Sequence, residues 1–580
     1  MHKIETRDGM LVEWDAPFQM SDGVIIRADI FRPTDGGKYP ALISYGPYGK
    51  GLAFQDGYRT AWEIMARDYP DALEGTSNKY ANWETVDPEK WVKHGYAIVR
   101  FDSRGAGRSE GFLSVHSPQE TLDICECIEK LAGFSWCNGK IGMNGISYFA
   151  SNQWRVAAKK PPALAAICVW EGFADNYRDA THHGGILSVF RKNWQEMQVK
   201  TVQHGVGERG AKSQVTGELV CGPDTLSEDE LARNRANMPD DLLRNYLDGP
   251  YYWELAGDLS EIKIPLLSAG NWGGQGLHLR GNIEGFLTAA SEQKWLEMHG
   301  GAHWAEFYTD YGVGIQKRFF DHFLKDEKSG WEEQPRVQIQ IRRPGQVRFE
   351  GRNENEWPLA RTKWTEFYLD PIKMRLEQTP SKARTNVSFL ASGNGVTFLS
   401  DPLEQEMEIT GPSALKLGIS SSSNDADIFV VLQVFDPVGE EVVFYGALDP
   451  HTPIAQGWLR ASHRKLDPER SLPYRPYHSH TTREILTPGH PVALDIEIWP
   501  TCVVVPAGYR IGLNIRGRDY EWEGAASTLS NMKRPMKGCG PFVHDDPDDR
   551  PQAIVEANYT IHFDLPQTPQ LILPIIPSAV

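Results

Sequence analysis

The stretch that decides the fold is Lys140-Ile141-Gly142-Met143-Asn144-Gly145-Ile146-Ser147-Tyr148-Phe149-Ala150. It is an apolar run ending in a tight Gly-x-Ser turn, which is how a nucleophilic serine is presented at the end of a buried strand. Such a turn strains the serine backbone, lifts the hydroxyl clear of the sheet and points the next backbone N–H at the same space. Gly145 leaves room for that close approach, although the usual second glycine is here Phe149. We therefore predict that Ser147 is a nucleophile.

Apolar runs on both sides of this stretch predict further strands of one sheet. Pro40–Tyr45 leads into the loop Gly46–Gly51, and Tyr96–Phe101 leads into the glycine-rich loop Asp102–Gly111. The later predicted strands are Ala163–Trp170, Ile264–Ala269 and Trp295–His299. Apolar runs separated by helical segments are typical of a parallel sheet with crossover helices. Active residues should then follow the carboxyl ends of the strands.

Three motifs at these strand ends resemble the cocaine-esterase and X-prolyl dipeptidyl-peptidase family of α/β-hydrolases, the CocE/NonD serine hydrolases. They are Pro47-Tyr48-Gly49-Lys50, the Asp-x-Arg-Gly-x-Gly-x-Ser-x-Gly loop Asp102–Gly111, and Gly145-Ile146-Ser147-Tyr148. The likeness extends over nearly the whole chain. It implies an α/β-hydrolase fold with an inserted helical cap and a carboxyl-terminal β-sandwich of the jelly-roll type.

The chain of 580 residues is too long for one core, so several domains are expected. We predict an α/β-hydrolase domain in two parts, residues 1–179 and 256–333, with a helical cap at 180–255 that includes a capped helix opening at Ser227. Residues 334–580 are predicted to form the β-sandwich, because short alternating runs recur there. Examples of these runs are Val337–Ile341, Leu494–Ile498 and Tyr509–Ile515.

A serine hydroxyl needs a base, and histidine has a suitable pKa for that task. In the family the base lies in the loop after the last core strand, and His303 is the residue that matches this place. His299, inside that strand, and His278, in the helix after Gln275, are weaker alternatives.

The carboxylate that orients the histidine is where this sequence departs from the family. Relatives usually carry an aspartate shortly after the strand that ends here at Ala269, whereas this chain has Asn271-Trp272-Gly273-Gly274. A carboxylate is needed to set the imidazole tautomer and to stabilise the imidazolium. We hypothesise that Glu171 supplies it, because Glu171 directly follows the neighbouring strand. Asp175 and Glu284 are lesser candidates.

The oxyanion formed during attack needs hydrogen-bond donors aimed at it. The backbone N–H of Tyr148 follows from the geometry of the turn. The resemblance implies that the second donor is the phenol of Tyr48, and the Pro-Tyr-x-Lys match favours Tyr48 over the nearby Tyr45.

Composition limits the partners that we expect. The net charge of −17 argues against nucleic acid and anionic membranes. The sequence has no apolar run of about 18 residues and no apolar core of a secretion signal near its start, so cytoplasmic location is the default expectation. Seven scattered cysteines suit reduced thiols, and the ligand spacing of Cys125-Glu126-Cys127 is too short for a usual zinc site. We expect no metal and no cofactor, and a homo-oligomer remains open.

These observations predict a serine hydrolase that cleaves a small-molecule ester or amide through an acyl-enzyme on Ser147, of the carboxylesterase or acylase type. One alternative is an X-prolyl-type peptidase or an amino-acid ester hydrolase. Another is a non-hydrolytic binding protein or redirected chemistry on the same fold, which the missing loop aspartate favours. A carbohydrate-binding role of the jelly roll is a further alternative.

Overall fold

An eleven-stranded sheet organises the amino-terminal half of the chain in the computed structural model, which describes residues 2–577. Its strand order is β1-β2-β3-β5-β4-β6-β7-β10-β11-β12-β13. The strands are β1 (Lys3–Arg7), β2 (Met10–Gln19), β3 (Ile25–Arg32), β4 (Tyr39–Gly46), β5 (Ala97–Asp102), β6 (Cys137–Ile146), β7 (Leu164–Trp170), β10 (Leu266–Asn271), β11 (Lys294–His299), β12 (Val337–Ile341) and β13 (Glu350–Glu354). The strands from β5 to β12 in that order run parallel, so their carboxyl ends lie along one edge.

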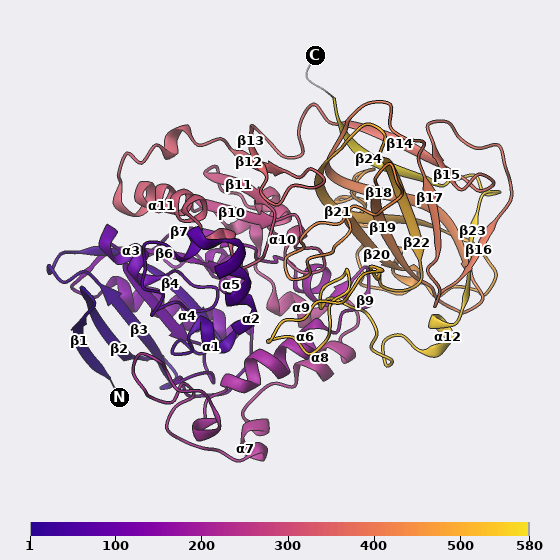
Figure 1. The fold of residues 1–580 in the computed structure, drawn as a ribbon. Coiled ribbons are helices and arrows are strands. Elements are labelled where there is room, and N and C mark those ends of the chain that lie inside the picture. Colours follow the sequence, from indigo (N-terminus) through magenta and orange to yellow (C-terminus); the bar gives the residue numbers. More distant parts are fainter. Residues whose placement is uncertain (1, 578–580) are drawn as a thin grey trace.

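Helices cover both faces of this sheet (Figure 1), which explains why its central strands read as continuous apolar runs. On one face, α4 (Pro118–Ala132) and α5 (Tyr148–Lys159) share a core with Ala41 and Ile43 of β4. On the other face, α11 (Asp310–Lys325) shares a core with Leu42, the residue between them. The α10 helix (Leu279–Thr288) packs on β10 and also contacts the carboxyl-terminal domain.

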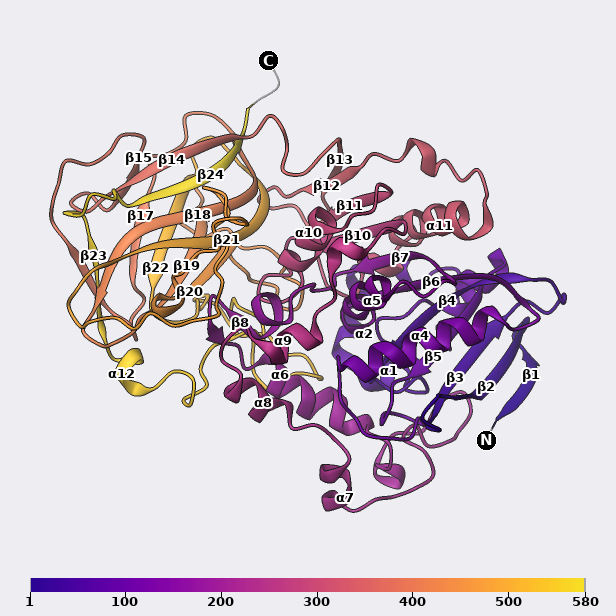
Figure 2. The same ribbon diagram turned by 180° about the vertical axis from the view of Figure 1, so that it is seen from behind.

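The segment after β7 carries short helices that lie beside the sheet (Figure 2). They are α6 (Phe190–Trp194), α7 (Glu228–Arg233), α8 (Met238–Arg244) and α9 (Pro250–Leu255). The predicted capped helix is confirmed at α7. There Ser227 accepts a hydrogen bond from the backbone of Glu230, and the Glu230 carboxylate accepts one from the backbone of Ser227.

The carboxyl-terminal domain is built from strands alone apart from short helical turns. Its strands are β14 (Lys363–Asp370), β15 (Arg375–Glu377), β16 (Val387–Leu390), β17 (Val396–Leu399), β18 (Met407–Ser421), β19 (Asp427–Phe435), β20 (Ala455–Arg460), β21 (Val492–Val505), β22 (Arg510–Arg516), β23 (Asn558–His562) and β24 (Gln570–Ile576). The order β18-β21-β20-β19-β22-β17-β15-β14-β24 closes on itself through pairing of β18 with β24, which gives a ring of nine strands. Apolar side chains from all sides of this ring form one core.

One strand lies in a different sheet from the one we expected. We placed Val337–Ile341 in the carboxyl-terminal β-sandwich, but β12 pairs parallel with β11 and antiparallel with β13 in the first sheet. Its alternating burial arises because one side packs on the core and the other is half-exposed. That pattern is the same in either sheet, so it does not say which partner a strand takes.

The structure also bears on the expectations about the cysteines and about membrane-spanning helices. All seven cysteines have free thiols, as predicted, and Cys125 and Cys127 lie on α4. Among residues 2–577, no helix combines the length and apolar character needed to cross a membrane.

Candidate active site

Ser147 lies at the junction of β6 and α5, in a backbone conformation that L-residues rarely adopt. Its φ is 58° and its ψ is −109°. Gly145, two residues before it, has a φ of 152°, and a Cβ there would lie 2.5 Å from Cβ of Phe149 and 3.1 Å from the carbonyl oxygen of Glu84. Phe149 fits in place of the usual glycine because Gly46 at the end of β4 has no side chain where the phenyl ring packs. The turn therefore has the strained form that the sequence predicts.

Both predicted oxyanion donors line the same cavity as Ser147. Tyr148 is the first residue of α5, where a backbone N–H has no acceptor within the helix. The phenol oxygen of Tyr48 accepts a hydrogen bond from Nε1 of Trp194 at 3.0 Å, which leaves its own proton to donate. Burial raises the pKa of Tyr48 well above its ordinary value, so this proton stays in place at neutral pH.

The structure brings Glu171 against His303. Glu171 directly follows β7, which lies between β6 and β10. Its Oε2 lies 2.7 Å from Nδ1 of His303, and both side chains are buried. Burial alone would raise the pKa of Glu171, but the charge and hydrogen bonds of His303 and His299 lower it to about 2. Burial opposes charging of His303, but Glu171 and then Glu84 raise its pKa to about 10.

Asn271, which stands where the family has its aspartate, supports Glu171 instead. Its Nδ2 donates to Oε1 of Glu171 at 3.2 Å and to the carbonyl oxygen of Gly301 at 2.8 Å. His299 lies 3.0 Å from the same Oε1 through its Nε2 and 2.7 Å from Glu297 through its Nδ1. The carboxylate of Glu171 is thus held by several donors, which orient its second oxygen toward His303.

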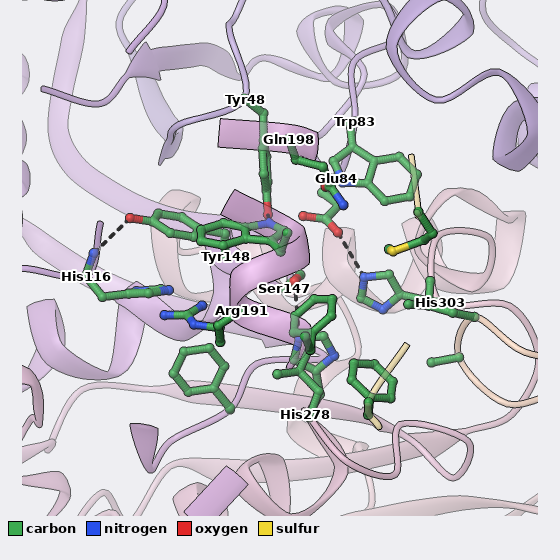
Figure 3. Close-up of a pocket in the computed structure, with 18 residues that line it drawn as sticks. Tyr48, Trp83, Glu84, His116, Ser147, Tyr148, Arg191, Gln198, His278 and His303 are labelled. Carbon is green, nitrogen blue, oxygen red and sulfur yellow. Dashed lines mark hydrogen bonds and ion pairs between the residues drawn. The ribbon is translucent and has the colours of Figure 1, made fainter. Parts of the chain in front are cut away.

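The histidine that touches the serine is His278 and not His303. Oγ of Ser147 lies 3.1 Å from Nε2 of His278, which precedes α10 rather than lying within it, whereas no hydrogen bond joins Ser147 to His303 in the described chain. The two imidazoles lie parallel with their centres 5.1 Å apart (Figure 3). Burial, and then the charge of His303, lower the pKa of His278 well below its ordinary value.

Glu84 is the functional candidate that the sequence reasoning missed. Its Oε1 lies 2.9 Å from Nε2 of His303, on the ring nitrogen opposite the one that Glu171 binds. Its Oε2 is buried without a hydrogen-bond partner, and burial raises the pKa of Glu84 to about 7. Glu84 lies outside the recognised motifs, within Asn82-Trp83-Glu84-Thr85. The sequence signal at this position is an acidic residue next to a tryptophan, which is weak evidence for a functional site.

The remaining walls of the cavity come from three parts of the chain. Phe190 and Trp194 of α6 line it. Ala447 and Phe542 are among the residues that the carboxyl-terminal domain contributes. The space open to the centre of a water-sized sphere is about 30 Å³, so the free interior of the cavity is small.

One cluster at the cavity has residue types that can bind a metal ion. Glu171, His278 and His303 present potential metal-ligand atoms within 4.8 Å of one another. However, the 2.7 Å contact between Glu171 and His303 is a hydrogen bond, which occupies the atoms that would face an ion.

The lesser candidates for the carboxylate that orients the histidine form ion pairs with arginines. Asp175 pairs with Arg178 at 2.8 Å, and Glu284 pairs with Arg475 at 2.7 Å.

Comparisons with known proteins found similar chains over most of the length of this protein. A family model described as X-Pro dipeptidyl-peptidase (S15 family) matches residues 22–305, and the X-Pro dipeptidyl-peptidase C-terminal non-catalytic domain matches residues 329–553. Cocaine esterase from Rhodococcus sp. is 25% identical over 68% of each chain. A solved CocE/NonD family hydrolase from Staphylococcus aureus is 30% identical, covers 98% of this chain and 94% of its own, and has a TM-score of 0.82. An α-amino acid ester hydrolase structure, 15% identical over 98% of this chain and 97% of its own with a TM-score of 0.68, shares the fold.

Proposed function

Because this chain belongs to the CocE/NonD family and is a serine hydrolase, we propose that it acts as a carboxylesterase or acylase through an acyl-enzyme on Ser147. The observation that carries the proposal is the strained turn at Ser147, which opens into one cavity with Tyr48 and His303. A serine held in this way, beside a base and donors for an oxyanion, suits acyl transfer.

In the proposed reaction, the resting imidazolium of His303 first passes a proton to Glu84 or to solvent, because Glu171 and Glu84 raise its pKa to about 10 against the effect of burial. The neutral ring then takes the proton of Ser147 while Oγ attacks the substrate carbonyl carbon. The phenol of Tyr48 and the backbone N–H of Tyr148 donate to the oxyanion that forms. The bond to the leaving group then breaks, and the leaving group takes the proton from His303. Water, deprotonated by the same histidine, releases the acid and restores the serine.

The choice of His303 over His278 as the base rests on the carboxylate partner. Glu171 binds Nδ1 of His303, which leaves Nε2 to face the substrate side, whereas no carboxylate binds His278 among the described residues. Because Nε2 of His303 is held by Glu84 at rest, the imidazole must exchange this partner for Ser147 when a substrate binds. His278 then serves as the resting partner of the hydroxyl.

A second candidate function is hydrolysis of amino-acid esters or X-prolyl peptides. It is favoured by the buried Oε2 of Glu84, which lacks a partner and lines the cavity, where it could receive an ammonium group. Comparison of 4-nitrophenyl esters of alanine and propionate tests it, because a preference for alanine that Glu84→Gln removes would favour this function.

The domain organisation extends the proposal. We assign residues 1–179 and 256–333 to the hydrolase domain, 180–255 to a cap and 334–580 mainly to a jelly-roll β-sandwich. The strands β12 and β13 are the exception, because they extend the first sheet. The closed ring of strands supports a separate carboxyl-terminal domain. The cavity residues Ala447 and Phe542 support the proposal that this domain forms one wall of the active site.

Covalent labelling tests the assignment of the nucleophile. A small fluorophosphonate and the acetyl group of 4-nitrophenyl acetate should both label Ser147, as peptide mapping would show, and Ser147→Ala should lose both labels. Ser151→Ala is the matched control, because its hydroxyl binds the carbonyl oxygen of Ser147 one helical turn away and should keep the labels. If the folded wild-type chain takes neither label, the proposal fails.

A further inference from the structure

Arg191 is a buried cation in the active-site cavity that has no anionic partner. It lies on α6, is 5% exposed and lines the cavity together with Ser147. Its Nε is buried without a hydrogen-bond partner, and its side chain makes no hydrogen bond or ion pair with the described residues. The side chain instead lies over the rings of Trp194, at 4.9 Å, and Phe173, at 5.6 Å.

Such an arrangement is costly without a ligand, because burying a guanidinium removes its hydration and nothing in the protein replaces it. Contact with aromatic faces compensates only in part. Other buried arginines of the described chain have partners that accept from them. Arg178 binds Asp175 and Asp248, each at 2.8 Å, and Arg155 binds the ring of His116 at 2.9 Å and lies 3.8 Å from Glu120.

His116 adds a second unpaired donor to the same cavity. Its Nδ1 accepts from Arg155, so the proton of the ring lies on Nε2. That Nε2 is buried and has no partner, and His116 lines the cavity. Burial, and then the charges of Arg191 and Arg155, lower the pKa of His116 well below its ordinary value, so the ring is a neutral donor. Both residues lie on the side of Ser147 away from His303 (Figure 3).

Two donors without acceptors, one of them charged, define an anion site beside the nucleophile. We infer that Arg191, assisted by His116, binds a carboxylate of the substrate, so that the preferred substrates are esters or amides carrying a free carboxylate. The planar fork of a guanidinium matches the two oxygens of a carboxylate. This inference rests on the proposed function and specifies the substrate class of the same site.

Two pairs of esters test the inference, and the members of each pair differ only in whether one carboxyl group is free and charged or methylated and neutral. The first is 4-nitrophenyl hydrogen glutarate against its methyl ester, with the carboxylate on the acyl side. The second is 4-acetoxybenzoate against its methyl ester, with the carboxylate on the leaving group. In at least one pair the wild type should prefer the anion, and Arg191→Met should lower kcat/KM for that anion about 10- to 100-fold and for its neutral partner less than about 3-fold.

Lys192→Met is the matched control, because Lys192 carries the same charge on the same helix but is largely exposed and pairs with Asp546 at 3.4 Å. It should leave the ratio of anionic to neutral kcat/KM unchanged. Arg191→Lys keeps the charge but loses the fork, and it should fall between wild type and Arg191→Met. Thermal melting of each variant separates loss of the anion site from loss of the fold.

Binding of glutarate, measured by calorimetry, gives a readout that does not depend on turnover. Wild type should bind it at least about 10-fold more tightly than Arg191→Met. Hydrolysis of the neutral esters without any preference for charge, and equal glutarate binding by both proteins, would overturn the inference and leave the serine hydrolase intact. Failure of all four esters to acylate Ser147 would instead refute the proposed function, and glutarate binding would still decide the anion site.

Discussion

Replacing Glu171 by Gln should reduce turnover steeply while leaving the fold intact. The amide can keep its oxygen toward Nδ1 of His303, and its NH₂ group can face Nε2 of His299 if that ring gives up its proton. Loss of that proton is feasible for the following reason. Burial lowers the pKa of His299, whereas Glu297 and Glu171 raise it to about 10. Gln in place of Glu171 removes one of these two charges. Nδ2 of Asn271 then loses Glu171 as an acceptor but keeps the carbonyl oxygen of Gly301. The variant therefore removes a charge without leaving a cavity.

The magnitude follows from the charge that the carboxylate supplies to the imidazolium. At a separation of about 4 Å and an effective dielectric constant of about 20, the attraction is about 4 kcal/mol. Loss of this stabilisation in the transition state corresponds to about a 10³-fold fall in kcat. Since Glu171 raises the pKa of His303, its loss lowers that pKa, so the acid limb of the pH profile of kcat should move to lower pH.

Steady-state hydrolysis of 4-nitrophenyl acetate between pH 6 and about 11, corrected for spontaneous hydrolysis, measures both effects, because this range contains the pKa of about 10 of His303. Glu284→Gln is the control, because Glu284 pairs with Arg475 at 2.7 Å outside the cavity, and it should stay within about 3-fold of wild type. If Glu171→Gln also stays within about 3-fold and its pH profile does not move, Glu171 does not act through His303.

Three further tests divide the remaining roles. Tyr48→Phe should lower kcat about 10²-fold, because one oxyanion donor is lost. Tyr45→Phe is the control and should change kcat by less than about 3-fold. It removes only an acceptor of the Arg104 backbone N–H outside the cavity. His303→Gln should lower kcat by about 10³-fold or more, and His278→Gln by only about 10-fold, since only the first histidine has a carboxylate partner. Glu84→Gln should move the acid limb of kcat/KM to lower pH, because the charge of Glu84 is one of the causes that raise the pKa of His303.

Each of these three has an outcome that contradicts it. Full turnover by Tyr48→Phe would remove the phenol from the oxyanion site. A larger loss from His278→Gln than from His303→Gln would make His278 the base, in agreement with its 3.1 Å contact to Ser147 at rest. An acid limb of Glu84→Gln that stays in place or moves to higher pH would show that Glu84 does not act on the base. Circular dichroism of every variant serves as the control for folding.

Local patterns in the amino-acid sequence were enough to predict the parallel sheet and the nucleophile turn. Continuous apolar runs bounded by glycine-rich loops are buried on both faces, which only a sheet covered by helices provides. The position of Glu171 was also within reach, because the α/β-hydrolase fold that the motifs imply places the end of β7 between those of β6 and β10. These features depend on local pattern and on the rules of strand connection.

Which polar groups meet inside the cavity depends on contacts between distant segments, and the sequence did not predict them. The approach of Glu84 to His303, the contact of Ser147 with His278 and the lack of a partner for Arg191 depend on loops and short helices far apart in the chain. No local pattern encodes such contacts, because they arise from the packing of separate segments. The pairing of β12 with β11 was undecided for the same reason, since alternation shows that one face of a strand is buried and leaves its neighbour unspecified.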